Sequence, residues 1–283
     1  MSRIATALGL SAGRYGSAVF VGALDDHTTD LAVAWSVRKR LLSSYTGPLF
    51  RVRRDADDAE QDIGYDATTG LRDQAALEAF CVGGTGSGYI RKIYDQFGAG
   101  VDIGQATAAY QPKLVEASVM NADGMDFNGT TTHIDTASLA YTNFMAADKL
   151  HALFALTASR NGNSRLFSFN ADAVGAWCLY AETTVYWDSP YPIARINYDP
   201  ASYYDLAHTM SFEAEADGSM RIRRNGTVDH SGSGNIVLSG TSVMHIGSLN
   251  DTTSPWKGRM TDIVFWKSAA SAACAAREAA LMS

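Results

Sequence analysis

The second half of the chain is a succession of short β-forming segments. From about Met125 onward they alternate apolar and polar residues and are separated by turn residues at fairly regular spacing. This pattern is typical of an all-β sandwich, because each strand buries one face against a second sheet. The sharpest turn signal is Asn225-Gly226, which favours a two-residue type I′ turn because both residues accept positive φ. The expected strands are 124–128, 131–135, 149–157, 164–169, 175–181, 183–188, 192–197, 206–214, 219–224, 227–230, 242–247 and 257–266.

The remaining segments predict two further strands, one of them at residues 89–94, and two helices. Residues 49–54 alternate two apolar residues with arginines, as a half-buried strand requires. Residues 71–80 space their apolar side chains at helical intervals, which predicts a short helix. Residues 267–282 are rich in Ala and lack helix breakers, so we expect a closing helix that docks on a sheet.

The first thirty residues are rich in Ala, Gly and Ser and carry only scattered hydrophobic side chains. Such a segment cannot form a core of its own, so residues 1–30 are expected to be an extended arm that packs on something else. Residues 31–283 then form one domain. The fold class expected is all-β: a concanavalin A-like antiparallel β-sandwich, or jelly roll, with a short helix near 71–80 and a C-terminal helix.

Composition excludes several classes of function. The net charge of −7 argues against a non-specific nucleic-acid binder, which needs a concentrated basic face. Cys81, Cys178 and Cys274 are odd in number and far apart, which favours buried free thiols over disulfides or a metal site. The apolar run at the N-terminus is too short for a signal peptide, and no stretch is long enough to span a membrane. We therefore expect a soluble protein made in a reducing cytoplasm.

Several motifs resemble those of concanavalin A-like and laminin-G-like domains. Residues 127–135 resemble the opening strand pair of these domains, and residues 218–227 resemble their Asn-Gly hairpin. The Ile-Gly pair at 246–247, followed by residues 256–266, resembles their closing strand. Together these motifs cover about half of the chain, and they imply the sandwich fold without specifying a ligand.

The first half resembles one family more closely. The run Tyr94-Asp95-Gln96-Phe97-Gly98-Ala99-Gly100 resembles a Tyr-Asp-Gln-x-Gly-x-Gly signature in the catalytic domain of fungal α-L-arabinofuranosidase B. The same arrangement also resembles a module of tailed-bacteriophage virion proteins, which carry a short Ala/Gly-rich stretch before it. Further segments in register with this signature are 42–54, 62–64, 80–81 and 105–107.

The arabinofuranosidase resemblance implies a pair of catalytic carboxylates. In that family the nucleophile is a Glu after a Gly-x-Trp, and the acid/base is an Asp after an Ile-Gly strand. The corresponding residues here are Glu182, after residues 175–177, and Asp251, after residues 246–250. Each is displaced by about one residue, and within a strand such a slip turns a side chain to the opposite face unless a bulge restores it.

The vicinal cysteine pair near the family's substrate pocket has no counterpart in the matching residues 166–170. With the displaced carboxylates, this favours a protein that is not an enzyme. If it is an enzyme, the resemblance implies a retaining glycosidase, whose two carboxyl groups lie about 5 Å apart.

Aromatic residues are concentrated between residues 177 and 204. Rings on a concave sheet can stack on sugars while amides bind hydroxyl groups, but aromatics are equally good core fillers or subunit contacts. The alternatives for Glu182 and for residues 250–253 are an exposed strand position and a polar turn. The carbohydrate-binding candidates are Trp177, Tyr180, Tyr186, Trp187 and Asn250.

Two acidic segments have structural interpretations. In the 94–100 signature, we expect Asp95 to cap backbone amides and the glycines to take positive φ. Residues 55–58 contain three aspartates that could bind calcium, but without EF-hand spacing. No cofactor is expected otherwise.

Three functions follow from these observations. The first is a tailed-phage virion protein, in the capsid or tail, made in the host cytoplasm and displaying a lectin-like module that binds cell-surface polysaccharide. It would contact other virion proteins through residues 1–30 and form a homo-oligomer such as a trimer, with neither nucleic acid nor membrane as a partner. The second is an arabinofuranosidase-like glycoside hydrolase, and the third a decoration protein without a ligand.

Overall fold

The computed structural model describes most of residues 19–282. The residues within that range that it leaves undescribed are 83–85, 118, 121–123, 147–148, 160–161, 163, 170–176, 182–184, 189–194, 199–203, 235–239, 251–252 and 270. The expected arm therefore lies largely outside the described part. In residues 19–30, the described part of the arm, Leu24 is buried, and its amide donates a hydrogen bond to the Leu41 carbonyl at 2.9 Å. The short helix η1 (Asp25–His27) follows it.

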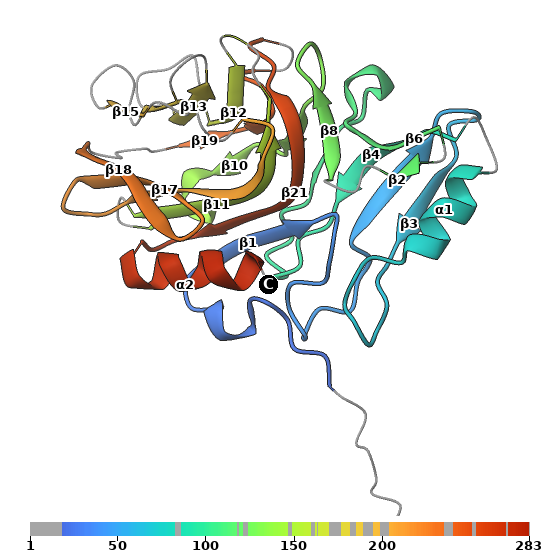
Figure 1. The fold of residues 1–283 in the computed structure, drawn as a ribbon, viewed down its shortest axis with the longest axis horizontal. Coiled ribbons are helices and arrows are strands. Elements are labelled where there is room, and N and C mark those ends of the chain that lie inside the picture. The colour runs from blue at the N-terminus through green and yellow to red at the C-terminus, as the bar shows by residue number, and fades with distance from the viewer. Residues whose placement is uncertain are drawn as a thin grey trace, which may run out of the picture.

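The molecule is an antiparallel β-sandwich, as the strand and turn pattern predicts (Figure 1). One sheet, here called sheet A, contains the two strands that precede the candidate carboxylates, β13 and β20. In spatial order its strands are β15 (Arg195–Tyr198), β14 (Val185–Asp188), β13 (Trp177–Ala181), β12 (Ser164–Phe169), β20 (Met244–Ile246), β9 (Ile134–Thr136), β5 (Ile103–Gly104), β4 (Gly88–Ile93), β2 (Phe50–Arg54) and β3 (Glu60–Ile63).

The facing sheet B is built around the long strand β21 (Lys257–Trp266). On one side of β21 lie β11 (Leu150–Ala158), β16 (Ala207–Ala214), β17 (Ser219–Arg224) and β18 (Thr227–Ser233). On its other side, residues 262–266 of β21 pair with β1 (Leu31–Ser36), and residues 257–260 pair with β8 (Met125–Asn128). Strand β8 pairs in turn with β6 (Lys113–Glu116), and β6 pairs with β7 (Val119–Met120).

Strand β4 belongs to both sheets. Its first residues, Gly88 and Tyr89, pair with β6 of sheet B, whereas Lys92 and Ile93 pair with β5 of sheet A. Along its other edge it pairs with β2. The sandwich is therefore closed along this side by hydrogen-bonded backbone.

The core lies between the sheets and is rich in aromatic side chains. Phe167 of sheet A stacks on Phe154 of sheet B with ring centroids 5.3 Å apart, and Phe212 and Phe265 pack around this pair. Cys81 and Cys274 are buried free thiols, as expected from their spacing.

Two helices lie outside the sandwich (Figure 1). Helix α2 (Ser271–Met282) lies on the outer face of sheet B against β11 and β16, which confirms the predicted closing helix. Helix α1 (Gln74–Val82) begins later than expected, because the Asp73 carboxylate accepts the Ala76 amide at 2.9 Å and caps it there. No helix in the described part of the chain is long and apolar enough to cross a bilayer.

Local turn chemistry agrees with the sequence. Asn225 and Gly226 have φ of 47° and 81°, as a type I′ turn between β17 and β18 requires.

Short elements complete the fold: the helices η2 (Ala108–Tyr110) and η3 (Tyr141–Asn143), and the two-stranded sheet of β10 (Leu139–Ala140) and β19 (Thr241–Ser242).

Candidate functional site

The strands before the two candidate carboxylates flank β12. Phe167 of β12 lies opposite Leu179 of β13 on one side and opposite Ile246 of β20 on the other. Since β13 and β20 are both antiparallel to β12, they run in the same direction. Their C-terminal ends therefore meet at one end of sheet A, beside the start of β12.

Glu182 and Asp251 themselves lie outside the described residues, but the residues next to them are described. Ala181, the last residue of β13, lies opposite Ser164 at the start of β12. On the other side, the Arg165 amide donates to the Ser254 carbonyl at 2.9 Å. Both segments thus approach the first two residues of β12.

The loop at residues 247–256 folds back over β12. The Gly247 amide donates to the Leu166 carbonyl at 2.8 Å, and the buried Ser168 hydroxyl donates to the Ser248 carbonyl at 3.0 Å. The Thr253 amide closes the turn by donating to the Asn250 carbonyl at 2.8 Å. Hydrogen bonds therefore attach the described residues before and after Asp251 to β12.

Of the carbohydrate-binding candidates, Trp177 begins β13 opposite Phe169, at the other end of β12, whereas Tyr180 and Asn250 are nearer to the start of β12. Tyr180 of β13 is the cross-strand partner of Tyr186 of β14; the side chains of both, and that of Trp177, lie outside what the structure describes. Trp187 is fully buried and packs edge-to-face on Phe212, with centroids 5.7 Å apart, so it occupies a core position. Asn250 is half-buried in the turn.

A cluster that the sequence did not single out lies on the outer face of the same sheet. Asp135 of β9 accepts a hydrogen bond from His245 Nδ1 of β20 at 2.8 Å, and its second oxygen lies 3.4 Å from His133 Nε2. Burial raises the pKa of the Asp135 carboxyl, but the contacts with His133 and His245 outweigh it, and the pKa is lowered. The available signal was the alternation in His133-Ile134-Asp135, which places both polar residues opposite the buried Ile134.

The Tyr-Asp-Gln signature is structural, as predicted. Asp95 is buried and accepts the amides of Ala34 and Phe97 at 3.1 Å each, while burial raises the pKa of its carboxyl. Gln96 accepts the Leu41 amide at 2.6 Å. The two glycines of the signature, Gly98 and Gly100, both have positive φ.

The acidic run after β2 is paired with arginines. Asp57 and Asp58 lie 2.7 Å and 2.8 Å from guanidinium nitrogens of Arg54 and Arg53. Arg53 is more buried than the expected outward position implies, because Gln111 also accepts a hydrogen bond from its Nε at 2.7 Å. Within the described residues, no group of three or more His, Cys, Asp or Glu side chains is arranged to hold a metal ion.

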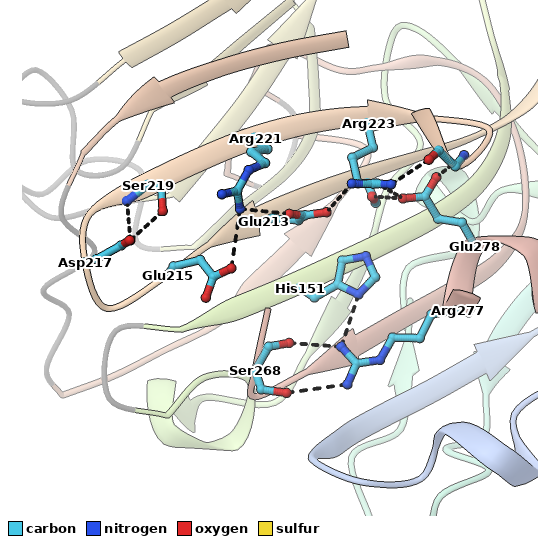
Figure 2. Close-up of polar contacts among 12 residues, drawn as sticks. His151, Glu213, Glu215, Asp217, Ser219, Arg221, Arg223, Ser268, Arg277 and Glu278 are labelled. Carbon is cyan, nitrogen blue, oxygen red and sulfur yellow. Dashed lines mark hydrogen bonds and ion pairs between the residues drawn. The ribbon is translucent and has the colours of Figure 1, made fainter. Parts of the chain in front are cut away.

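A larger charged cluster lies beneath α2 (Figure 2). Glu278 of α2 lies 3.0 Å from Arg223 of β17, which also contacts Glu213 of β16 at 3.2 Å. Next to it, Arg277 stacks over the Trp266 ring and lies 3.4 Å from His151 Nδ1. These groups are buried and bind one another, so they attach the helix to the sheet and present no open site.

Two of the cavities formed by described residues lie elsewhere on the surface. One, of about 490 Å³, is lined by polar residues of β2, β4, β6 and β8, including Tyr89 and Lys113. The other, of about 410 Å³, lies between β11, β16 and the end of α2 at Leu281. Neither is lined by residues next to the two candidate carboxylates.

Comparison with known proteins agrees with this architecture. Residues 25–149 match the family model for the catalytic domain of α-L-arabinofuranosidase B. A solved arabinofuranosidase in complex with arabinofuranosyl-α-1,2-xylobiose superposes with a TM-score of 0.67 at 18% identity, covering 91% of this chain and 64% of that one. The chain has the sandwich fold of the α-L-arabinofuranosidase B catalytic domain. A mutant GH54 α-L-arabinofuranosidase soaked with 4-nitrophenyl α-L-arabinofuranoside gives the same TM-score at 17% identity.

The chain matches about a fifth of the length of two curated relatives. A probable α-L-arabinofuranosidase B of Aspergillus fumigatus is 41% identical over 103 residues, which are 35% of this chain and 20% of the relative. An α-L-arabinofuranosidase of Hypocrea jecorina is 39% identical over 94 residues, which are 32% of this chain and 18% of the relative.

These similarities correct the first functional hypothesis. The interpretation as a phage virion protein, with a capsid or tail location, is wrong, because the similar proteins are fungal arabinofuranosidases. That hypothesis depended on the composition of residues 1–30 and on a module that the enzyme family also contains. These similarities also disagree with the expectation that the protein is not an enzyme, because the similar proteins are arabinofuranosidases.

Proposed function

We propose that the protein is a retaining glycoside hydrolase that acts on α-L-arabinofuranosides, with Glu182 as nucleophile and Asp251 as acid/base. The observation that carries this proposal is the arrangement of β13 and β20 on either side of β12. Both strands end at the same end of the sheet, beside the start of β12. Adjacent strands are about 4.8 Å apart, so β13 and β20 are separated by roughly 10 Å. Two carboxyl side chains that extend toward each other across this gap can reach the separation of about 5 Å that retention requires.

The displacement of each carboxylate by one residue is compatible with this role. A slip of one residue reverses a side chain only inside a regular strand. The described part of β13 ends at Ala181 and β20 ends at Ile246, so both carboxyl residues come after these strands in the sequence. Beyond the end of a strand, its alternation no longer sets the direction of a side chain.

The two carboxyl groups would divide the reaction between them. Glu182 attacks the anomeric carbon of the arabinofuranosyl group while Asp251 gives its proton to the departing glycosidic oxygen. Asp251 then removes a proton from water, which releases the sugar from Glu182 with the original anomeric configuration. Hydrogen bonds from Gly247 and Ser168 hold the segment before Asp251 against β12 during both steps.

Hydrolysis of 4-nitrophenyl α-L-arabinofuranoside tests this proposal. We expect release of nitrophenol by the parent protein, with NMR detection of the α-anomer as the first product. Glu182→Gln and Asp251→Asn should each lower kcat/KM by about 100-fold or more, while the exposed substitution Glu116→Gln should not. Absence of hydrolysis by the parent, or full activity of the Glu182→Gln variant, would contradict the assignment.

A further inference from the structure

The outer face of sheet A carries an oriented histidine on β20, the strand that leads to the proposed acid/base Asp251. Cross-strand pairing places Ser168 of β12, His245 of β20 and Asp135 of β9 in one row. The neighbouring row, Phe167, Ile246 and Ile134, faces the core. The first row therefore lies on the outer surface of the sheet, where Ser168 is covered by the loop that leads to Asp251.

The inner side of this cluster is closed by hydrogen bonds. His133 Nδ1 lies 3.0 Å from the Thr131 carbonyl, which can only accept, so this nitrogen carries the proton. His133 Nε2 lies 2.9 Å from the Gln105 amide nitrogen and 3.4 Å from the Asp135 carboxylate. His133 and Gln105 thus form a fixed wall behind Asp135.

Asp135 in turn fixes the tautomer of His245. An ionised carboxylate is an acceptor only, so the 2.8 Å contact places the proton of His245 on Nδ1. His245 Nε2 is left as an acceptor, and it has no hydrogen-bond partner among the residues that the structure describes. The side chain is 13% exposed, so this nitrogen is close to solvent.

We propose that His245 Nε2 accepts a hydrogen bond from a hydroxyl group of the bound sugar, and that Asp135 positions the imidazole for this contact. The proposal rests on the hydrolase function above and adds a substrate-binding residue to it. Hydroxyl groups of a sugar are donors as well as acceptors, so an imidazole nitrogen held in one orientation is a suitable partner. The chain that leads from His245 to Asp251 folds back over Ser168, the cross-strand neighbour of His245, so it passes next to this histidine.

A spectroscopic experiment tests the contact directly. The chain has 6 histidines, and ¹⁵N–¹H correlation of the imidazole rings distinguishes their tautomers. The Glu182→Gln variant should show His245 protonated on Nδ1, and titration with methyl α-L-arabinofuranoside should shift the Nε2 resonance of His245. The exposed or distant rings, such as that of His230, should not respond. An unchanged His245 resonance at millimolar glycoside would overturn the proposal.

Kinetic variants provide the second measurement. His245→Ala should lower kcat/KM for the nitrophenyl arabinofuranoside by about tenfold, the effect of one lost hydrogen bond. Asp135→Ala should give a similar loss together with a mixture of His245 tautomers, whereas His230→Gln should leave both readouts unchanged. If a variant does not fold, the titration of the Glu182→Gln protein still decides the question.

The outcomes separate this proposal from the hydrolase function. Hydrolysis by the parent without a response of His245 contradicts the histidine contact and leaves the enzyme assignment intact. A response of His245 without hydrolysis supports the sugar contact and contradicts the enzyme assignment. If neither is observed, both are wrong.

Discussion

Gly226 and Gly247 both have positive φ but differ in the space available for a side chain, so the cost of substitution should differ. At Gly226, φ is 81° and a Cβ would have no neighbour within 4 Å. At Gly247, φ is 87° and a Cβ would lie 2.4 Å from the buried ring of Phe127. We expect Gly226→Ala to cost about 1 kcal/mol of unfolding free energy, from backbone strain alone. Gly247→Ala should cost about 3 kcal/mol, because strain and overpacking add.

Urea denaturation of both alanine variants measures this difference. Equal losses would show that the Phe127 ring moves aside without cost. Because Gly247 begins the loop that contains Asp251, its substitution should also lower hydrolysis of the nitrophenyl arabinofuranoside, whereas Gly226→Ala should not.

His151 makes stability depend on pH. It is fully buried, and desolvation followed by repulsion from Arg277 and Arg223 lowers its pKa well below the ordinary 6.5. Below pH 6.5 the unfolded chain takes up a proton that the folded protein does not, so stability falls as the pH is lowered, by about 1.4 kcal/mol per pH unit. Between pH 6.5 and 5 the parent should therefore lose about 2 kcal/mol more than the His151→Gln variant.

The comparison with His151→Gln isolates this effect. The buried carboxyls Glu213 and Glu278 have raised pKa values and act in the opposite direction, but they are present in both proteins. Parallel curves of unfolding free energy against pH would show that His151 takes up a proton in the folded state.

Sequence reasoning succeeded at residues whose role is local. Asp95 was predicted to cap nearby amides, since an Asp followed by spaced glycines makes a turn whatever the rest of the fold. His245 and Asp135 were missed because they are 110 residues apart, and only the pairing of β20 with β9 brings them together. Trp187 was named as a carbohydrate-binding candidate with core packing as the alternative, and the structure places it in the core.

At the scale of elements, helix α2 depends on its ion pairs. Glu278 accepts a hydrogen bond from the Ser211 hydroxyl at 2.6 Å and pairs with Arg223, with no exposure to solvent. Removal of one partner leaves a buried charge without its counterion, so Glu278→Ala should cost about 3–5 kcal/mol of unfolding free energy. The surface pair of Lys113 and Glu116 is the control, and Glu116→Ala should cost less than about 1 kcal/mol.

Chemical denaturation followed by circular dichroism measures both losses. A cost below about 1 kcal/mol for Glu278→Ala would mean that water replaces the carboxylate beneath α2.

The strands of the second half were predictable because each is short, alternates and ends at a turn. Strand β12 was expected at its observed bounds, Ser164–Phe169, and β17 likewise at Ser219–Arg224. Helix α1 was placed too early because residues 71–72 fit a helical pattern but form isolated β-bridges with Lys39 and Tyr65. Those bridges are tertiary contacts, which a local pattern does not contain.

At the scale of the molecule, the sharing of β4 (Gly88–Ile93) between the two sheets was not predictable from the sequence. Its change of partner from β6 to β5 follows from the closure of the sandwich and has no local sequence signal. The carboxylates were found from the family resemblance, but their meeting at one end of β12 required the order of the strands.

A fragment tests how far the two halves depend on each other. Without residues 1–124, β8 loses its partner β6 and β9 loses its partner β5, so the core of the sandwich is exposed along that side. We expect a fragment of residues 125–283 to lack cooperative thermal unfolding, while the full chain shows it. A fragment with a sharp transition and native-like circular dichroism would show that sheet B and the rest of sheet A form an independent unit.

The shared strand also limits how this protein could be recombined with its relatives. Strands β2, β4, β5, β6, β8 and β9 are joined in a continuous set of pairings between residues 50 and 136. A chimera with a crossover inside this block would inherit mismatched partners on both sheets at once. Parental segments should therefore be exchanged after Thr136 and before β11, where the similarity to the arabinofuranosidase family model also ends.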